Sequence, residues 1–225
     1  HMGLLSVLLA WHQMDPVDEK ELLRNDAVFK HQRNRNPFID NPKWVGCLFG
    51  TACVDGGTVE PGADAEVWIN EFHYDNDGRD KGEFVEIAGP AGTNLSGWTL
   101  VGYNGASGGF YRIITLSGEI PDQSNGLGTL AFDFRNLQNG PSDGLALVNG
   151  DNEVVEFLSY EGTVTATNGP ANGMNSVDIG RAESTSTPAG HSLQREGDGR
   201  TAISFSWGEA APATRGEINT EQSLD

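Results

Sequence analysis

The sequence has 225 residues, of which 14 are Lys or Arg and 32 are Asp or Glu, so the formal charge is −18. This acidity excludes a protein whose whole surface binds DNA, because phosphate recognition depends on an excess of Lys and Arg. The composition, 37% hydrophobic and 20% charged, also excludes a membrane protein and a highly charged disordered chain.

The charge is distributed unevenly along the chain. Residues 1–60 contain six basic and eight acidic side chains, whereas residues 61–225 contain eight basic and 24 acidic ones. The net charges of the two parts are therefore −2 and −16. Together with the linker-like composition of Asp55–Asp64, this asymmetry predicts a helical region over 3–45, a linker over 46–64 and a second domain over 65–225.

The first apolar run, Leu4–Trp11, is too short to cross a hydrocarbon core of roughly 30 Å. No basic residue precedes the run after the cloning-type His1-Met2 pair, and no small-residue cleavage site follows it. The run therefore predicts a short buried helix and not a signal peptide or a membrane span.

A second helix is predicted from Pro16 to Gln32. Asp15 can cap its first turn, and Pro16 stands where a missing N–H group costs nothing. The helix should end near Asn34, because Asn36 precedes Pro37 and is thereby disfavoured in the α region.

Three stretches in this region carry a family resemblance: Leu8–Val17 (LLAWHQMDPV), Arg24–Asn25 and Gln32–Asp40 (QRNRNPFID). Over residues 4–45 the chain resembles the C-terminal end of the secreted bacterial endonuclease I family. The resemblance implies a secreted parent enzyme that hydrolyses extracellular DNA or RNA with a catalytic His and a divalent cation such as Mg²⁺. The family's catalytic His and metal ligands lie upstream of this segment. We therefore place no catalytic role on His12 or His31, and expect this chain to be non-catalytic on its own.

The same region contains candidate nucleic-acid-binding residues. In an intact nuclease Arg24, Asn34 and Arg35 could approach a phosphate backbone, because Arg presents a planar fork of donors. The alternative is structural: Arg24 and Asn25 brace neighbouring helices, while Asn34 and Asn36 stabilise the turn.

Cys47 and Cys53 are the only two cysteines. Because the resembled family is secreted, a local disulfide between them is expected, and it would contribute about 2 kcal/mol in the chain-entropy model. Their spacing does not fit a zinc site. A redox pair is the alternative to a structural disulfide, although it lacks the usual CxxC spacing.

From residue 65 onward, hydrophobic residues alternate with polar ones in short runs punctuated by Gly, Asn, Asp and Pro. The runs predict strands at 66–74, 82–88, 98–103, 110–116, 129–134, 144–148, 153–160, 191–195 and 203–207. Seven to nine short antiparallel strands predict a mainly β fold, an immunoglobulin-like β-sandwich preceded by the helical segment.

The second part also carries a family resemblance. Its matching stretches are Ile69–Asn76, Gly82–Ile87, Leu95–Leu100, Ser142–Leu147 and His191–Arg195. Over residues 66–222 these resemble the lamin tail domain, an immunoglobulin-like sandwich that bacteria attach to secreted nucleases and surface proteins. The resemblance implies a binding or spacing module whose ligand is unknown.

The most chemically distinctive feature of this part is the acidic run Asp75–Glu83. Asp75, Asp77, Asp80 and Glu83 provide carboxylate oxygens that suit Ca²⁺. The alternative needs no cation, because Asn-Asp-Gly at 76–78 is also a favourable hairpin turn.

Two histidines and three tryptophans are the other candidates for chemistry in this part of the chain. No Ser or carboxylate spacing marks His73 or His191 as the base of a catalytic triad. Trp68, Trp98 and Trp207 could form a carbohydrate platform, but their strand spacing favours core packing.

The sequence therefore predicts the C-terminal part of a secreted metal-dependent endonuclease, truncated before its catalytic half and carrying a non-catalytic sandwich. Nucleic acid would be bound only through the parent nuclease region, and no membrane span is expected. The alternative is a stand-alone cell-surface or adhesion module, with the helices serving only as a brace.

Overall fold

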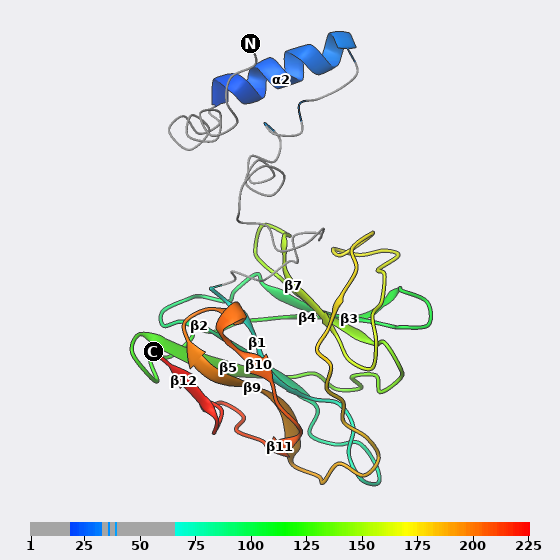
Figure 1. Ribbon diagram of the computed structural model, residues 1–225, viewed down its shortest axis with the longest axis vertical. Helices are drawn as coiled ribbons and strands as arrows, with labels where there is room; N and C mark the ends of the chain where they lie inside the picture. The colour runs from blue at the N-terminus through cyan, green and yellow to red at the C-terminus, as the bar shows by residue number, and fades with distance from the viewer. Residues whose placement is uncertain (1–18, 33–35, 37–38, 40–65) are drawn as a thin grey trace, which may run out of the picture. The chain divides into compact units, whose positions relative to one another are not determined.

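The computed structural model of the chain describes residues 19–32, 36, 39 and 66–225 (Figure 1). The chain divides into two units, His1–Thr58 and Val59–Asp225. The predicted helix at Leu4–Trp11, the predicted linker and both cysteines, Cys47 and Cys53, lie outside the described residues.

In the first unit, helix α2 spans Glu19–Gln32, within the range predicted from the capping pattern. Lys30 and His31 occupy its last turn, where positive charge interacts favourably with the helix dipole. The side chain of Asn25 is buried and reaches the chain beyond the helix. Its Oδ1 accepts the N–H of Asn36 at 2.8 Å, and its Nδ2 donates to the Asn36 carbonyl at 3.3 Å.

The second unit contains two β-sheets, which confirms the predicted β-sandwich (Figure 1). The first sheet has the order β10 (Ser206–Trp207), β9 (His191–Gly199), β1 (Trp68–His73), β2 (Phe84–Pro90) and β5 (Leu127–Asp133), with β11 (Ala211–Pro212) and β12 (Gln222–Leu224) also pairing with β9. The second sheet has the order β4 (Phe110–Thr115), β3 (Thr99–Tyr103), β6 (Gly144–Val148), β7 (Val154–Ser159) and β8 (Val177–Asp178).

Residues from both sheets form the main hydrophobic core. Val85 and Ile87 of β2 reach it by simple alternation, because side chains two apart share one face of a strand. In β1, Ile69 and Phe72 reach the same core although they are three residues apart. A bulge between Ile69 and Glu71 adds the extra residue that makes this spacing possible.

A smaller apolar cluster covers the other face of the second sheet. Tyr103 of β3 and Phe157 of β7 pack there with ring centroids 5.0 Å apart, and Val164, Ala166 and Ala171 from the segment after β7 complete the cluster. The Tyr103 hydroxyl also accepts the N–H of Ala171 at 3.0 Å. This long connection is therefore part of the packed structure.

A buried ion pair links the two sheets. The guanidinium of Arg195 on β9 donates to the carboxylate of Glu156 on β7, and the other Glu156 oxygen accepts the N–H of Ile69 on β1 at 2.7 Å. Arg195 also donates to the carbonyls of Ile69 at 2.9 Å and Ala202 at 2.8 Å. Both charged groups are thus fully bonded in the interior.

The strand pattern departs from the prediction in two ways. The predicted strand 203–207 is wrong in its first half, because Ala202–Ser204 form a 3₁₀ turn that buries Ala202 and leaves Ile203 exposed. Two pairings are parallel, between β7 and β8 and between β9 and β12, where an entirely antiparallel arrangement was expected. Among the described helices, none is long and apolar enough to cross a membrane.

Candidate functional site

The candidate nucleic-acid-binding residues belong to the first unit. Arg24 lies on α2 and is exposed, whereas Asn34 and Arg35 lie outside the described residues. Asn25, next to Arg24, is the residue that braces the chain at Asn36. The bracing role considered for Asn25 therefore agrees with its contacts.

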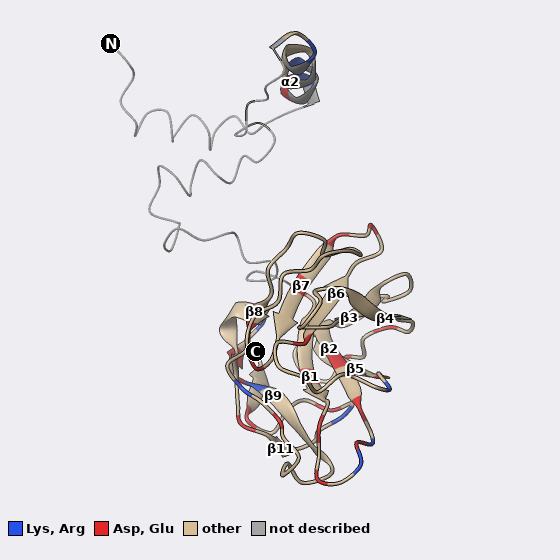
Figure 2. Ribbon diagram, turned by 90° about the vertical axis from the view of Figure 1, so that its right-hand side faces the viewer, with Lys and Arg blue, Asp and Glu red and all other residues tan. Residues whose placement is uncertain are grey.

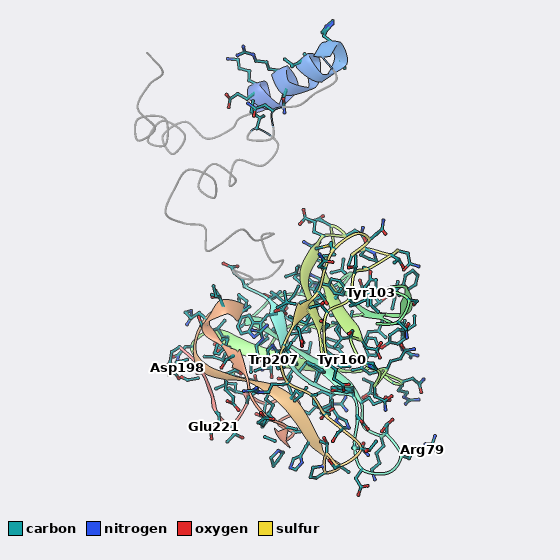
Figure 3. All side chains as sticks on the ribbon, turned by 45° about the vertical axis from the view of Figure 1, so that its right-hand side comes forward. Arg79, Tyr103, Tyr160, Asp198, Trp207 and Glu221 are labelled. Atoms are coloured by element: carbon teal, nitrogen blue, oxygen red, sulfur yellow. The ribbon has the colours of Figure 1, made fainter. Side chains whose placement is uncertain are left out.

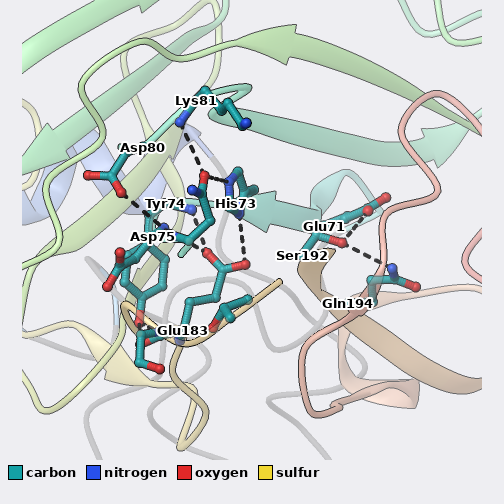
Figure 4. A network of polar contacts seen from close by, with 12 residues as sticks. Glu71, His73, Tyr74, Asp75, Asp80, Lys81, Glu183, Ser192 and Gln194 are labelled. Atoms are coloured by element: carbon teal, nitrogen blue, oxygen red, sulfur yellow. Dashed lines mark hydrogen bonds and ion pairs between the residues drawn. The ribbon is translucent and has the colours of Figure 1, made fainter. Parts of the chain in front are cut away.

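The candidate metal residues lie on the connection between β1 and β2, residues 74–83 (Figure 4), called the acidic loop below. It is longer than the tight Asn-Asp-Gly hairpin considered from the sequence. Gly78 and Gly82 both have positive φ, +83° and +78°, a conformation that L side chains rarely adopt. The chain bends at residues 77–79 within this longer connection.

Asn76 holds the acidic loop together from within. Its side chain is fully buried, and its Nδ2 donates to the carbonyls of Asp77 at 2.8 Å and Arg79 at 3.2 Å. Its Oδ1 accepts the N–H of Lys81 at 3.2 Å. Arg79 lies at the outer end of the loop (Figure 3).

Glu183, distant in sequence, fixes the start of the acidic loop (Figure 4). Its Oε2 accepts the backbone N–H groups of Tyr74 at 2.6 Å and Asp75 at 3.0 Å. Its own N–H donates to the Tyr74 hydroxyl at 2.7 Å, and that hydroxyl donates to Glu161 at 2.9 Å. This role of Glu183 could not be predicted from the sequence, because residues 179–190 match no strand or turn motif that points to residue 74.

His73 is engaged on both ring nitrogens. Nδ1 lies 2.8 Å from Glu183 Oε1, and Nε2 lies 3.2 Å from Asn76 Oδ1. Burial lowers the pKa of His73, but the hydrogen bond and the charge of Glu183 outweigh it, so the pKa is raised. With 2% of its surface exposed, His73 serves packing and loop closure rather than contact with a solvent-borne substrate.

The four predicted metal residues occupy different environments. Asp75 is buried, Asp80 and Glu83 are half-buried, and Asp77 is exposed. Glu83 Oε2 accepts the N–H of Asn136 at 2.6 Å, while Asp80 Oδ2 accepts Nδ2 of Asn139 at 3.3 Å. Within the described part of the chain, no three His, Cys, Asp or Glu side chains converge in a manner that would hold a metal.

Of the three tryptophans considered as a carbohydrate platform, Trp68 is buried, and Trp98 and Trp207 are half-buried and pack against the core. Trp68 is fully buried and stacks on Phe205 with ring centroids 5.6 Å apart. Trp207 contacts Phe72 edge-on at 5.2 Å and lies under the guanidinium of Arg195 at 5.0 Å (Figure 3). Trp98 packs against the main core. The core-packing interpretation is therefore confirmed.

A buried acidic pair, Glu71 on β1 and Glu86 on β2, was not singled out by sequence reasoning. Glu71 accepts hydrogen bonds from Ser192 Oγ and from the N–H and hydroxyl of Thr214, the latter two at 2.9 Å. Glu86 accepts the N–H of Gly216 at 2.6 Å. Burial first, and then the charge of Glu71, raise the pKa of Glu86 to about 8. Through these hydrogen bonds with Thr214 and Gly216, the pair holds the C-terminal segment against the first sheet.

The comparisons with known proteins concern the first unit. Residues 1–43 match the family described as Endonuclease I. Over 46 residues the chain is 58% identical to an extracellular ribonuclease of Bacillus amyloliquefaciens. The aligned segment is 20% of this chain and 16% of that protein. Over 44 residues the chain is 56% identical to an extracellular ribonuclease of Bacillus subtilis (strain 168), covering 19% and 15%. No solved structure matches the chain. The N-terminal fifth of the chain is therefore similar to the Endonuclease I family, and the chain spans only a small part of the curated relatives that it matches.

Proposed function

We propose that residues 1–45 form the terminal part of a secreted, metal-dependent nuclease of the endonuclease I type. The observation that carries the proposal is the 58% identity over 46 residues to a protein named extracellular ribonuclease, together with the family match over residues 1–43. The proposed substrate is extracellular RNA or DNA, and the proposed reaction is metal-assisted hydrolysis of a phosphodiester bond.

In this proposal the matched segment supports the nuclease and does not itself cut nucleic acid. The Asn25–Asn36 contact ties the chain after α2 back to the helix. Arg24, Asn34 and Arg35 are the residues proposed to contact the phosphate backbone. The catalytic His and the Mg²⁺ ligands belong to the rest of the nuclease.

The sandwich is proposed to be a lamin-tail-type module that binds a partner or acts as a spacer. Its two-sheet architecture supports this assignment. Acidic residues outnumber basic ones across its strands and loops (Figure 2), and the net charge of residues 61–225 is −16. Because such a surface repels polyanions, the partner of the sandwich is not nucleic acid.

A chimaera tests the proposal directly. In the extracellular ribonuclease of Bacillus subtilis, the 44 matching residues are replaced by their counterparts from this chain, and secreted ribonuclease activity is measured on RNA and plasmid DNA with Mg²⁺. Activity within about tenfold of the parent enzyme is expected. The chain by itself should cut neither substrate.

A matched pair of chimaera variants separates support from contact. Asn25→Ala removes the brace and should lower the chimaera's melting temperature, whereas Arg24→Gln should raise the KM for RNA without changing stability. An inactive chimaera that is folded and secreted would refute the proposal and favour a stand-alone surface module. Cutting by the purified chain that survives repeated purification would equally contradict it.

A further inference from the structure

Asp75, in the acidic loop, carries a buried carboxylate oxygen that has no bonding partner. The residue is 6% exposed, and its Oδ1 is covered by protein without accepting a hydrogen bond. Burial of an ionised oxygen without a donor or a cation is unfavourable. A buried carboxylate oxygen of this kind is a candidate ligand for a cation.

The charged groups around Asp75 are themselves negative and do not neutralise its carboxylate. Burial is the largest cause that raises its pKa, and the next are the charge of Asp80 and direct contact with the Asp80 carboxyl. Glu183 contributes further repulsion. Neither Asp75 nor Asp80 takes part in an ion pair with any basic side chain in the part of the chain that the structure describes. Two facing carboxyls thus lack a counter-charge.

A third oxygen-bearing side chain completes the group. Asn139, from the connection between β5 and β6, places its amide 3.3 Å from Asp80 Oδ2 and also contacts the Asp75 carboxyl. Rotation of this amide about its last bond exchanges its NH₂ and its carbonyl oxygen. The same side chain can therefore donate to the carboxylates when the site is empty and ligate a cation when it is filled.

The acidic loop is held in place before any ligand binds. Glu183 accepts the N–H of Asp75, Asn76 joins both ends of the loop, and the N–H of Asp77 donates to the Thr187 carbonyl at 2.8 Å. A site on such a loop loses little conformational entropy when it binds an ion.

We propose that a single Ca²⁺ binds between the carboxylates of Asp75 and Asp80 and the side-chain amide of Asn139. Two carboxylates balance the charge of a divalent cation, and all three ligands are the hard oxygens that Ca²⁺ prefers. Ca²⁺ tolerates an irregular ligand set completed by water, whereas Mg²⁺ demands near-octahedral geometry. The site is smaller than the four-carboxylate set expected from the sequence: Asp77 is exposed, and Glu83 already accepts the N–H of Asn136. It lies wholly within the sandwich and does not depend on the proposed nuclease role.

Calcium titration of the whole chain tests the site. Isothermal titration calorimetry with CaCl₂ at pH 7.5 should give one site per chain with a Kd on the order of 10⁻⁴–10⁻³ M, the range of extracellular calcium modules. In 5 mM CaCl₂ the melting temperature should exceed that in EDTA by roughly 3–6 °C. MgCl₂ at the same concentration should give less than half of this shift.

Three single variants locate the ligands. Asp80→Asn and Asn139→Ala should weaken Ca²⁺ binding at least tenfold, while Asp77→Asn, which makes the same charge change as Asp80→Asn but at an exposed position of the same loop, should leave the Kd unchanged. Asp75→Asn should abolish the calcium-dependent shift. If Asp75→Asn fails to fold, the Ca²⁺ affinities of Asp80→Asn and Asn139→Ala still test the proposal.

Two results would overturn the proposal. One is a wild-type chain that shows neither binding heat nor a thermal shift in calcium. The other is calcium binding that both Asp80→Asn and Asn139→Ala leave unchanged, which would place the ion elsewhere on the chain.

Discussion

Substitution of Arg195 by Met removes the charged partner from the ion pair that links the two sheets. Met retains a long aliphatic side chain, so packing changes less than charge does. The substitution leaves Glu156 buried, with its Oε2 still accepting the N–H of Ile69 but its Oε1 unpaired. It also frees the carbonyls of Ile69 and Ala202 from their side-chain donor.

The expected loss is large because an uncompensated buried carboxylate is costly. Breaking a buried pair in this way costs about 3–5 kcal/mol of unfolding free energy. For a domain of this size each kcal/mol shifts the melting temperature by about 2–4 °C, so a fall of about 6–20 °C is expected. Addition of Glu156→Gln to the same chain should restore part of the loss, because the orphaned charge is then removed.

The measurement is urea unfolding followed by tryptophan fluorescence, with thermal unfolding by circular dichroism beside it. Arg181→Met is the matched control, because Arg181 and Glu209 form a pair 3.3 Å apart with 41% and 81% of their side chains exposed. An exposed pair of this kind contributes about 0–1 kcal/mol. The reasoning fails if Arg195→Met costs no more than Arg181→Met, or if the double variant with Glu156→Gln is less stable than Arg195→Met alone.

Three further outcomes are expected. Because the pKa of Glu86 is raised to about 8 by burial and by a neighbouring carboxyl, the folded state binds its proton more tightly than the unfolded chain does. The unfolding free energy, measured by urea unfolding at several pH values, should therefore fall by at most about 5 kcal/mol as the pH rises from about 4.5 to 8. Glu86→Gln should flatten this pH dependence. A pH dependence that is the same in Glu86→Gln and in the wild type would exclude Glu86 as its source. Gly128→Ala would place a methyl group 1.9 Å from a backbone carbonyl oxygen and should cost about 1–3 kcal/mol in urea unfolding, whereas Gly150→Ala, with open space around it, should change stability by less than about 1 kcal/mol. Asn25→Ala removes the acceptor of the Asn36 N–H, so hydrogen exchange at that amide should accelerate at least tenfold, and equal protection in both proteins would count against the brace.

The strands were predictable because their signal is local. In β2, Val85 and Ile87 alternate with Glu86, and a period of two places the first pair in the core. The same rule misleads in β1, where the bulge at Asn70 changes the spacing of core residues. Whether a bulge forms depends on the partner strand and on the groups that hydrogen-bond the side chain of the extra residue. Here Asn70 donates to Glu86 at 3.2 Å and to Gln222 at 3.1 Å.

The candidate cation site was only partly predictable for a related reason. The acidic run includes Asp75 and Asp80 among its four candidate ligands, because both lie in one short loop. The sequence could not reveal that Asn139 contacts Asp80, or that Glu183 fixes the backbone of Asp75, since 59 and 108 residues separate these partners along the chain. Such contacts arise only when the connections at one end of two sheets come together.

The buried carboxylates also change what the net charge means. Residues 66–225 contain 23 Asp and Glu and eight Lys and Arg. Six of these acids are buried, Glu71, Asp75, Glu86, Asp143, Glu156 and Glu183, as is one base, Arg195. Five of the six, all except Asp75, accept hydrogen bonds from backbone or side-chain groups and so support the fold. The remaining side chains still leave a net charge of about −10 outside the core, which disfavours a polyanion at any site on the sandwich. Residues 1–44, with six basic and six acidic side chains, have no net charge and carry no such barrier, which is compatible with the proposed nucleic-acid contact in this part of the chain.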